Sequence, residues 1–230
     1  MDIDSGKKLL KIIKNCQLEA GIYEHCFLSF GTALGAVRPT IRKYYKPNSY
    51  FTTGFMEHDG DSDMGILGDR ITPEQRENYF KICKSNGLMD NWAFADKREM
   101  RRPDTHELLW FSVKAEKGGA KMCQWFFWDF KGYSWHGKGK RWVNPRKFSI
   151  LQFPRSDKAQ GLALGAPAKY FEKLTEIDFE GMKHNVPLYL GSLLDYWYPG
   201  WLTPQKGGSS AKKTVLIINN WADKKTWRIL

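Results

Sequence analysis

Apolar positions near the N-terminus follow helical spacing first and strand-like spacing next. Over residues 5–24 they recur every three to four positions, which predicts an amphipathic helix with one buried face. Residues 26–30 (CFLSF) form a short apolar run typical of a buried strand, and residues 33–38 predict a helical turn soon after it. Residues 39–54 are rich in aromatic and turn-forming residues, so a loop or lid is expected there.

The middle of the chain carries the clearest boundary signals. A second strand is expected within residues 55–67. Thr72-Pro73-Glu74-Gln75 has the N-cap threonine, first-turn proline and third-position glutamine of a helix start, and that helix should end near Ser85. Residues 108–115 and 121–130 are aromatic-rich runs joined by a glycine-containing turn, which predicts a β-hairpin.

The last hundred residues predict a mixture of irregular and regular structure. Residues 133–155 are basic and contain glycine, so irregular structure is expected. Residues 177–186 predict a short hairpin that turns at Glu180-Gly181, and a helix should run from Pro187 to near Tyr198. Residues 206–214 predict a flexible basic loop. Because strands and helices follow no regular βαβ rhythm, an α+β fold is favoured over a doubly wound sheet.

Composition narrows the class of protein. Of the 230 residues, 42% are hydrophobic, which is enough for a folded core, and no apolar stretch reaches the ~20 residues of a membrane span. The N-terminal residues lack the apolar core of a signal peptide, so a cytoplasmic protein is expected. The formal net charge of +11 predicts an anionic partner: a nucleic acid, a nucleotide, a phosphorylated polymer or a membrane surface.

The four cysteines add to the expectation of a cytoplasmic protein. Cys16, Cys26, Cys83 and Cys123 form no C-x-x-C pair. Their wide spacing matches neither a zinc module nor a secreted disulfide framework. We therefore expect reduced, buried thiols.

An acidic run, EHDGDSD over residues 57–63, directly precedes an apolar strand end. On a strand, Asp61 and Asp63 project to the same face because side chains alternate. Two adjacent carboxylates repel each other unless a cation lies between them, and Mg²⁺ or Mn²⁺ favours oxygen ligands. An exposed acidic turn is the alternative interpretation. A calcium loop fails, because the twelfth position counted from Asp59 is Arg70 instead of glutamate.

Two further features favour a site that handles phosphate. Gly31-Thr32 lies between the predicted strand and the helical turn, where a glycine, a hydroxyl and a helix N-terminus together suit a phosphate group. Asp129 is a lone acid in the aromatic strand WFFWDF, where an unpaired charge is costly. It is a candidate third carboxylate for a metal site, with an edge position or a salt bridge as the alternative.

These motifs together resemble the nucleotidyltransferase fold and, more closely, the LicD/fukutin family of phosphotransferases. The match is densest at GTALGAVR (residues 31–38), DGDSDMGI (residues 59–66) and WFFWDF (residues 125–130). Residues 186–204, VPLYLGSLLDYWYPGWLTP, resemble the family's terminal pattern of a turn, a helix and a final proline. The resemblance therefore covers points along most of the chain.

The acids of the run match the family's motif position by position. Asp61 and Asp63 stand at the D-x-D acids, and Asp59 stands at the first acid of the run. His58 replaces the usual tryptophan, and Gly60 replaces the second acid. Asp59 is thus a further possible metal ligand on this resemblance.

The resemblance implies a metal-dependent transferase built on a mixed sheet flanked by helices. Members move a phosphorylated alcohol, such as phosphocholine or ribitol phosphate, from a CDP-linked donor to a glycan hydroxyl and release CMP. Mg²⁺ or Mn²⁺ held by Asp61, Asp63 and Asp129 would neutralise the diphosphate, and Asp129 would orient the acceptor hydroxyl. The catalytic domain would cover residues 1–205, with residues 206–230 packing on that domain.

Several other side chains are expected to contact substrate or phosphate. They are Gly31, Thr32, Arg38, His136, Lys138, Lys140 and Arg141. The expected partners are a CDP-linked nucleotide donor and a glycan or phosphorylated polymer as acceptor. Peripheral contact with the inner face of the membrane is compatible with this picture, whereas the converging acids argue against nucleic acid.

Two alternatives remain open from the sequence. The same D-x-D logic serves a nucleotidyltransferase that moves NMP from an NTP to a small molecule or RNA. Basic residues interleaved with aromatic ones also suit a non-enzymatic module that binds a glycan or nucleic acid. Dependence on Mg²⁺ separates the enzymes from the binding module, and a substrate screen separates the two enzymes.

Overall fold

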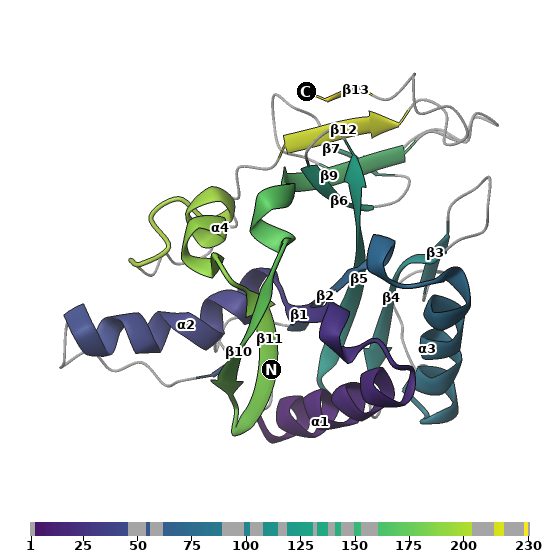
Figure 1. Cartoon of the computed structure of the whole chain (residues 1–230), viewed down its shortest axis with the longest axis horizontal. Helices are drawn as coiled ribbons and strands as arrows, with labels where there is room; N and C mark the ends of the chain where they lie inside the picture. The colour runs from purple at the N-terminus through teal and green to yellow at the C-terminus, as the bar shows by residue number, and fades with distance from the viewer. Residues whose placement is uncertain are drawn as a thin grey trace.

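A computed structural model of the chain describes residues 3–45, 54–55, 62–88, 99–101, 108–114, 119–130, 133–137, 141–143, 150–152, 161–203, 214–218 and 228–229. Within them lie four α-helices and three short 3-10 segments (Figure 1). The helices are α1 (Ile3–Glu19), α2 (Phe30–Tyr45), α3 (Pro73–Ser85) and α4 (Leu190–Trp197). The 3-10 segments are η1 (Tyr23–His25), η2 (Gly68–Arg70) and η3 (Ala168–Phe171).

A mixed sheet of nine strands organises these elements. The strands of the described chain are β1 (Cys26–Leu28), β2 (Ser62–Leu67), β3 (Glu99–Arg101), β4 (Leu108–Lys114), β5 (Lys121–Phe130), β6 (Tyr133–Gly137), β7 (Arg141–Val143), β8 (Ile150–Gln152), β9 (Gly161–Pro167), β10 (Leu174–Phe179), β11 (Met182–Pro187), β12 (Thr214–Ile218) and β13 (Arg228–Ile229). The sheet order is β1-β2-β5-β6-β9-β12-β13, and β4 and β3 branch from β5. β10 with β11 and β7 with β8 form separate two-stranded sheets.

The long strand β5 joins two parts of the sheet. Its first half pairs in parallel with β2 and antiparallel with β4, and its last residues pair antiparallel with β6. Figure 1 shows β5 running from the part of the sheet near α1 and α3 toward β6, β9 and β12. Helices and a sheet with both parallel and antiparallel pairs confirm the predicted α+β class.

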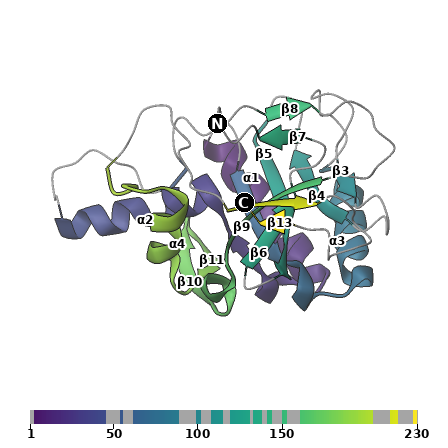
Figure 2. The same ribbon diagram turned by 90° about the horizontal axis from the view of Figure 1, so that it is seen from above.

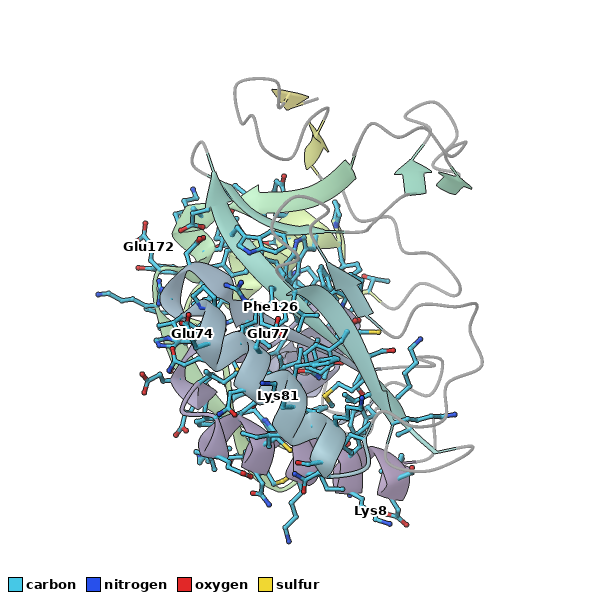
Figure 3. The ribbon with its side chains drawn as sticks, turned by 90° about the vertical axis from the view of Figure 1, so that its right-hand side faces the viewer. Lys8, Glu74, Glu77, Lys81, Phe126 and Glu172 are labelled. Carbon is cyan, nitrogen blue, oxygen red and sulfur yellow. The ribbon has the colours of Figure 1, made fainter. Side chains whose placement is uncertain are left out.

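The helices α1 and α3 cover one face of the sheet. The hydroxyl of Tyr79 on α3 donates a hydrogen bond to Oε1 of Gln124 on β5 (2.9 Å), and its ring packs on Phe111 of β4. The outer side of α3 carries exposed charged residues such as Glu74 and Lys81 (Figure 3). The helix is therefore amphipathic, and its apolar face fixes the first half of β5.

Aromatic rings from α2, α4 and η3 fill the opposite face. Phe27 on β1 lies between Phe127 and Phe171, with ring centroids 5.3 and 5.5 Å away, and Phe171 reaches Trp197 of α4 at 6.1 Å. Gly65 on β2 adjoins this group, and a Cβ atom there would collide with the ring of Phe27. The sequence keeps a glycine inside the strand because the aromatic ring occupies the space of a side chain.

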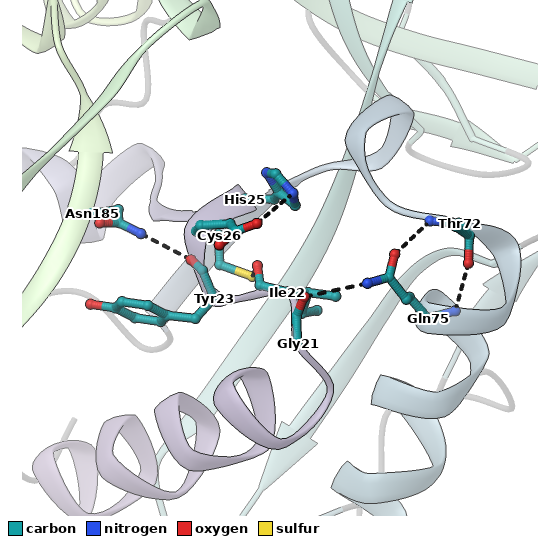
Figure 4. A network of polar contacts seen from close by, with 9 residues as sticks. Gly21, Ile22, Tyr23, His25, Cys26, Thr72, Gln75 and Asn185 are labelled. Carbon is teal, nitrogen blue, oxygen red and sulfur yellow. Dashed lines mark hydrogen bonds and ion pairs between the residues drawn. The ribbon is translucent and has the colours of Figure 1, made fainter.

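Hydrogen bonds join the turn between α1 and β1 to its neighbours (Figure 4). Thr72 and Gln75 form the predicted capping box of α3: the Thr72 hydroxyl accepts from the Gln75 backbone N–H, and the Gln75 side chain accepts from the Thr72 N–H. The Gln75 amide also donates to the carbonyl of Gly21 (3.3 Å), and Asn185 of β11 donates to the carbonyl of Tyr23 (2.9 Å). Local capping chemistry thus also sets where α3 and β11 lie.

Two predicted loops are wrong in part. α2 continues through Pro39 to Tyr45 (Figure 2), so residues 39–45 of the expected loop 39–54 are helical, and residues 46–53 lie outside the described residues. The proline costs the helix one backbone hydrogen bond, but residues 40–45 contain no glycine or second proline that would end it. The region 133–155, expected to be irregular, contains β6 as a full member of the sheet, between β5 and β9. β6 pairs with β5, which directly precedes it in sequence, and with the distant strand β9; this pairing overrides its weak local pattern.

Two expectations drawn from composition can also be compared with the structure. All four cysteines are free and buried, as the sequence predicted. In the part of the chain that the structure describes, no helix is both long enough and apolar enough to cross a membrane.

β12, which follows the predicted basic loop, pairs with β9 and so joins the main sheet.

Candidate functional site

The N-terminus of α2 meets the start of β2 directly. β1 ends at Leu28, and the backbone N–H of the next residue, Ser29, donates to the carbonyl of Asp63 (3.1 Å). Thr32, in the first turn of α2, accepts a hydrogen bond from the backbone N–H of Asp63 through its Oγ1 (2.8 Å). These two hydrogen bonds tie the start of α2, with Gly31 and Thr32, to β2 at Asp63. The two motifs that the sequence analysis linked therefore lie in contact.

The turn into α2 has an unusual backbone at Phe30. Its φ of +47° lies in the left-handed region, which costs a bulky residue on the order of 1–3 kcal/mol. The Phe30 ring is 6% exposed and packs against Trp197 at 4.6 Å, with the edge of Trp125 at 6.3 Å. Aromatic packing thus holds the sharp turn that brings Gly31 and Thr32 to β2.

The Asp63 side chain has a defined orientation. Asp63 is half-buried, and its Oδ1 accepts a hydrogen bond from Nε1 of Trp125 on β5 (2.7 Å). In the parallel register Asp63 pairs with Cys123, so Trp125 lies one step further along the same face of the sheet. The indole fixes one oxygen of the carboxylate, and Phe30 packs against that indole.

Ser29 and Trp125 are site residues that the sequence analysis missed. Ser29 is fully buried, and its hydroxyl has no hydrogen-bond partner among the described residues. A buried hydroxyl without a partner lowers stability, and such groups are rare in hydrophobic cores. Its position beside Gly31 and Thr32 therefore indicates a functional site. The sequence held no signal for this: serine just before a helix predicts an N-cap, but the Ser29 hydroxyl caps nothing among the described residues. For Trp125 no local signal existed, since its role depends on the strand pairing.

Asp129 does not lie near Asp63, which corrects the expectation of a third carboxylate. β2 and β5 are parallel, Asp63 pairs with Cys123 near the start of both strands, and Asp129 stands at the other end of β5. The six residue steps from Cys123 to Asp129 separate the two acids by about 20 Å along the strand. A metal ion bound at Asp63 cannot reach Asp129 at this distance.

Asp129 belongs to a different part of the surface. It is exposed, and its backbone N–H donates to Oδ2 of Asp69, which follows β2 (2.5 Å). A cavity of about 150 Å³ lies here. Its lining residues are Leu67, Asp69, Arg70, Phe127, Asp129, Ala168, Phe171 and Glu172. The guanidinium of Arg70 donates to the carbonyls of Phe171 and Glu172, so this cation joins η2 to η3.

Some of the remaining predicted site residues lie in described strands and helices, and others lie outside the described residues. His136 pairs with Phe127, which pairs with Leu67 at the far end of β2, so the backbone of His136 lies on the side of Asp129, away from Asp63. Arg38 lies in the middle of α2, and Arg141 lies on β7. Four predicted site residues lie outside the described residues: Asp59, Asp61, Lys138 and Lys140.

Asp63 offers the type of ligand atom that a hard cation prefers. Asp63 supplies carboxylate oxygen, the ligand type that Mg²⁺ and Mn²⁺ prefer, and one oxygen of its carboxylate is held by an indole that cannot itself ligate a metal. Among the residues that the structure describes, no group of three or more His, Cys, Asp or Glu side chains is placed to hold a metal ion. Within the described residues, the candidate site consists of Asp63 beside the N-terminus of α2.

We expect Thr32→Val to lower the free energy of unfolding by about 1–3 kcal/mol, because it leaves the half-buried N–H of Asp63 facing a buried methyl group instead of an acceptor. Valine keeps the shape of threonine, so the loss reports the hydrogen bond. Thr32→Ser, which keeps the hydroxyl, should cost about 1 kcal/mol for the missing methyl group. Urea unfolding of the three proteins measures both values. Equal stability of the valine variant and the wild type would contradict the proposed link.

Comparison with known proteins identifies no relative: no family model matches the chain, and no curated protein matches it. The functional argument therefore depends on the arrangement of residues alone. That arrangement joins Asp63 of β2 to the helix start at Gly31-Thr32, with the Asp63 carboxylate held by the Trp125 indole.

Proposed function

We propose that the protein is a metal-dependent transferase that moves a phosphorylated alcohol from a CDP-linked donor to a hydroxyl group of a glycan and releases CMP. Phosphocholine and ribitol phosphate are examples of the transferred group. The acceptor oxygen forms the new bond to phosphorus as the bond to the bridging oxygen of CMP breaks, and the proton of the acceptor hydroxyl passes to solvent water. The donor nucleotide and the glycan or phosphorylated polymer would be its partners, in the cytoplasm or at the inner face of the membrane.

One observation carries this proposal: the hydrogen bond from the Asp63 N–H to the Thr32 hydroxyl. It puts a carboxylate, a hydroxyl and a helix N-terminus side by side, and a diphosphate with its counter-cation needs these groups together. A simple acidic turn would not need a buried threonine beneath it. A basic binding surface would not place an acid there.

The chain's own residues would divide the work. Asp61 and Asp63 would hold Mg²⁺ or Mn²⁺, which when bound neutralises charge on the diphosphate. Gly31 is half-buried, so its backbone is accessible to a phosphate oxygen at the positive end of α2. The Thr32 oxygen accepts from Asp63, which leaves its own proton to donate to a phosphate oxygen. Trp125 would keep the Asp63 carboxylate in one orientation before substrate arrives.

A thermal-shift screen tests the proposal. CDP-choline, CDP-ribitol, CDP-glycerol, CTP and ATP are each added with Mg²⁺ or with EDTA. A CDP-alcohol at 100 times its Kd should stabilise the protein by about 2.7 kcal/mol, which for a chain of this length raises the melting temperature by about 5–10 °C. We expect that shift with Mg²⁺ only.

The Asp63→Asn variant is the control for this screen. Asp63→Asn should lose the shift while keeping its own melting temperature. A shift with CTP or ATP but with no CDP-alcohol would favour transfer of NMP. Equal shifts in EDTA, or none with any nucleotide, would overturn the proposal and favour a non-enzymatic binding module.

A further inference from the structure

The turn of the β10–β11 hairpin carries a buried acid. Phe179 pairs with Met182, so Glu180 and Gly181 form a two-residue turn, with φ values of +52° and +79°. Glycine suits this region, whereas glutamate adopts it only at a cost. The Glu180 side chain is nevertheless just 6% exposed. Both facts indicate that this carboxylate is held for a purpose beyond closing the hairpin.

Both oxygens of the Glu180 carboxylate have partners far away in the sequence. Oε1 accepts a hydrogen bond from the backbone N–H of Phe55 (2.9 Å), and Oε2 lies 3.1 Å from Nζ of Lys7 on α1. A buried carboxylate is tolerated when it is paired and hydrogen-bonded in this way. Figure 1 shows the tip of the hairpin beside the N-terminal end of α1.

Steric contacts complete the hold on Gly54 and Phe55. The Phe55 ring is buried against Phe179 at 5.1 Å, and a Cβ atom on Gly6 of α1 would come within 2.7 Å of that ring. Gly54 has a φ of +133°, and a Cβ atom there would collide with the Glu180 carboxylate. We call these contacts around Gly54 and Phe55 the Gly54–Phe55 clamp; besides that pair it comprises Gly6, Lys7, Phe179 and Glu180.

The clamp lies immediately before the acidic run. Only six residues lie between Phe55 and Ser62, the first residue of β2, so the seven Cα–Cα steps span at most about 24 Å. Thr32 holds Asp63 at the C-terminal end of this stretch, and the clamp holds Phe55 at its N-terminal end. We propose that Glu180 is a positioning residue: by holding Phe55, it supports metal binding by Asp63. This inference rests on the proposed function, because it assigns Glu180 to the same metal site.

Mn²⁺ affinity of the full-length chain tests the positioning role, with electron paramagnetic resonance as the readout. We expect Glu180→Ala to bind Mn²⁺ about 10-fold more weakly than the wild type, as when a group that orients metal ligands is removed. Glu180→Gln should recover most of the affinity, because its carbonyl oxygen still accepts from the Phe55 N–H. Glu180→Asp keeps the charge but is one methylene shorter, and should bind as weakly as Glu180→Ala.

Asp178→Ala is the matched control. Asp178 lies on the same hairpin and pairs with Lys183 at 3.0 Å, but both side chains are exposed and neither belongs to the clamp. Its Mn²⁺ affinity should equal that of the wild type. All variants are compared well below their melting temperatures, with far-UV circular dichroism confirming the fold. If Glu180→Ala does not fold, Glu180→Asp and Glu180→Gln decide the matter.

The outcomes separate the two proposals. Wild-type affinity in both Glu180→Ala and Glu180→Asp, or in Glu180→Asp alone where the alanine variant does not fold, would make the clamp merely structural and overturn the positioning role. Equally weak binding by Glu180→Gln would overturn it too, since the hydrogen bond to Phe55 would then not be the cause. A wild-type protein that binds Mn²⁺ no better than Asp63→Asn would overturn the proposed function itself, and the positioning role with it.

Discussion

The Asp63→Asn substitution is expected to lower turnover of a CDP-linked donor by about 1,000-fold, the equivalent of about 4 kcal/mol of transition-state stabilisation. Asparagine lacks the charge that holds a divalent cation, which is the physical reason for the loss. Its Oδ1 can still accept the hydrogen bond from Trp125, so the free energy of unfolding should change by less than about 1 kcal/mol. Release of CMP and urea unfolding measure the two quantities. Asp61→Asn should lose activity to a similar degree.

Asp129→Asn is the matched control for this prediction. It makes the same chemical change on the same strand as Trp125, but at the end of β5 that lies away from Asp63. Its turnover should stay within twofold of the wild type. A large loss in Asp129→Asn would mean that this acid reaches the reacting groups after all. Near-normal turnover in Asp63→Asn would remove the D-x-D acids from the mechanism.

Local chemistry accounts for most of the fold that could be predicted from the sequence. The capping box at Thr72 and Gln75 involves residues three positions apart, and the structure confirms it. The β4–β5 hairpin and the turn at Glu180-Gly181 were likewise read from adjacent residues and are confirmed. Such signals are reliable because partners that are close in sequence meet at little cost in chain entropy.

Pairing between distant strands accounts for the parts that were wrong. The sequence indicated that Asp129 ends an aromatic strand, but not which end of that strand lies beside the D-x-D acids. Only the parallel register of β2 and β5 decides this, and it puts Trp125 next to Asp63 in place of Asp129. The same limit applies to β6 on one side only: its partner β5 precedes it directly, but its other partner, β9, lies far along the chain.

The positive net charge acquires a more specific meaning once the fold is known. The ion pairs and cation contacts of the described residues include structural ones, such as Lys7 with Glu180 and the Arg70 guanidinium with the carbonyls of η3. These cations stabilise the junctions between elements and need no external anion. Net charge alone therefore says less about the partner than the site at Asp63 does.

Stability should fall steeply as the pH drops below 6.5, because of His184 on β11. His184 is 1% exposed, its Nε2 has no hydrogen-bond partner among the described residues, and the edge of Phe179 faces it. Burial, and secondarily the positive charge of Lys14, lowers the pKa of His184 from 6.5 to about 4. The unfolded chain takes up a proton near pH 6.5, whereas the folded protein does so only near pH 4. Between these values each drop in pH favours the unfolded state, to a total of about 3 kcal/mol.

Urea unfolding of the wild type and of His184→Gln at pH 7 and pH 5 measures this effect. Glutamine does not titrate, so the stability of the variant relative to the wild type should improve by about 2 kcal/mol between the two pH values. His25→Gln is the control: burial also lowers the pKa of His25, but this side chain is partly exposed, and its removal should change the pH dependence less. Parallel pH profiles of the wild type and His184→Gln would mean that the buried imidazole is not the group whose protonation unfolds the protein.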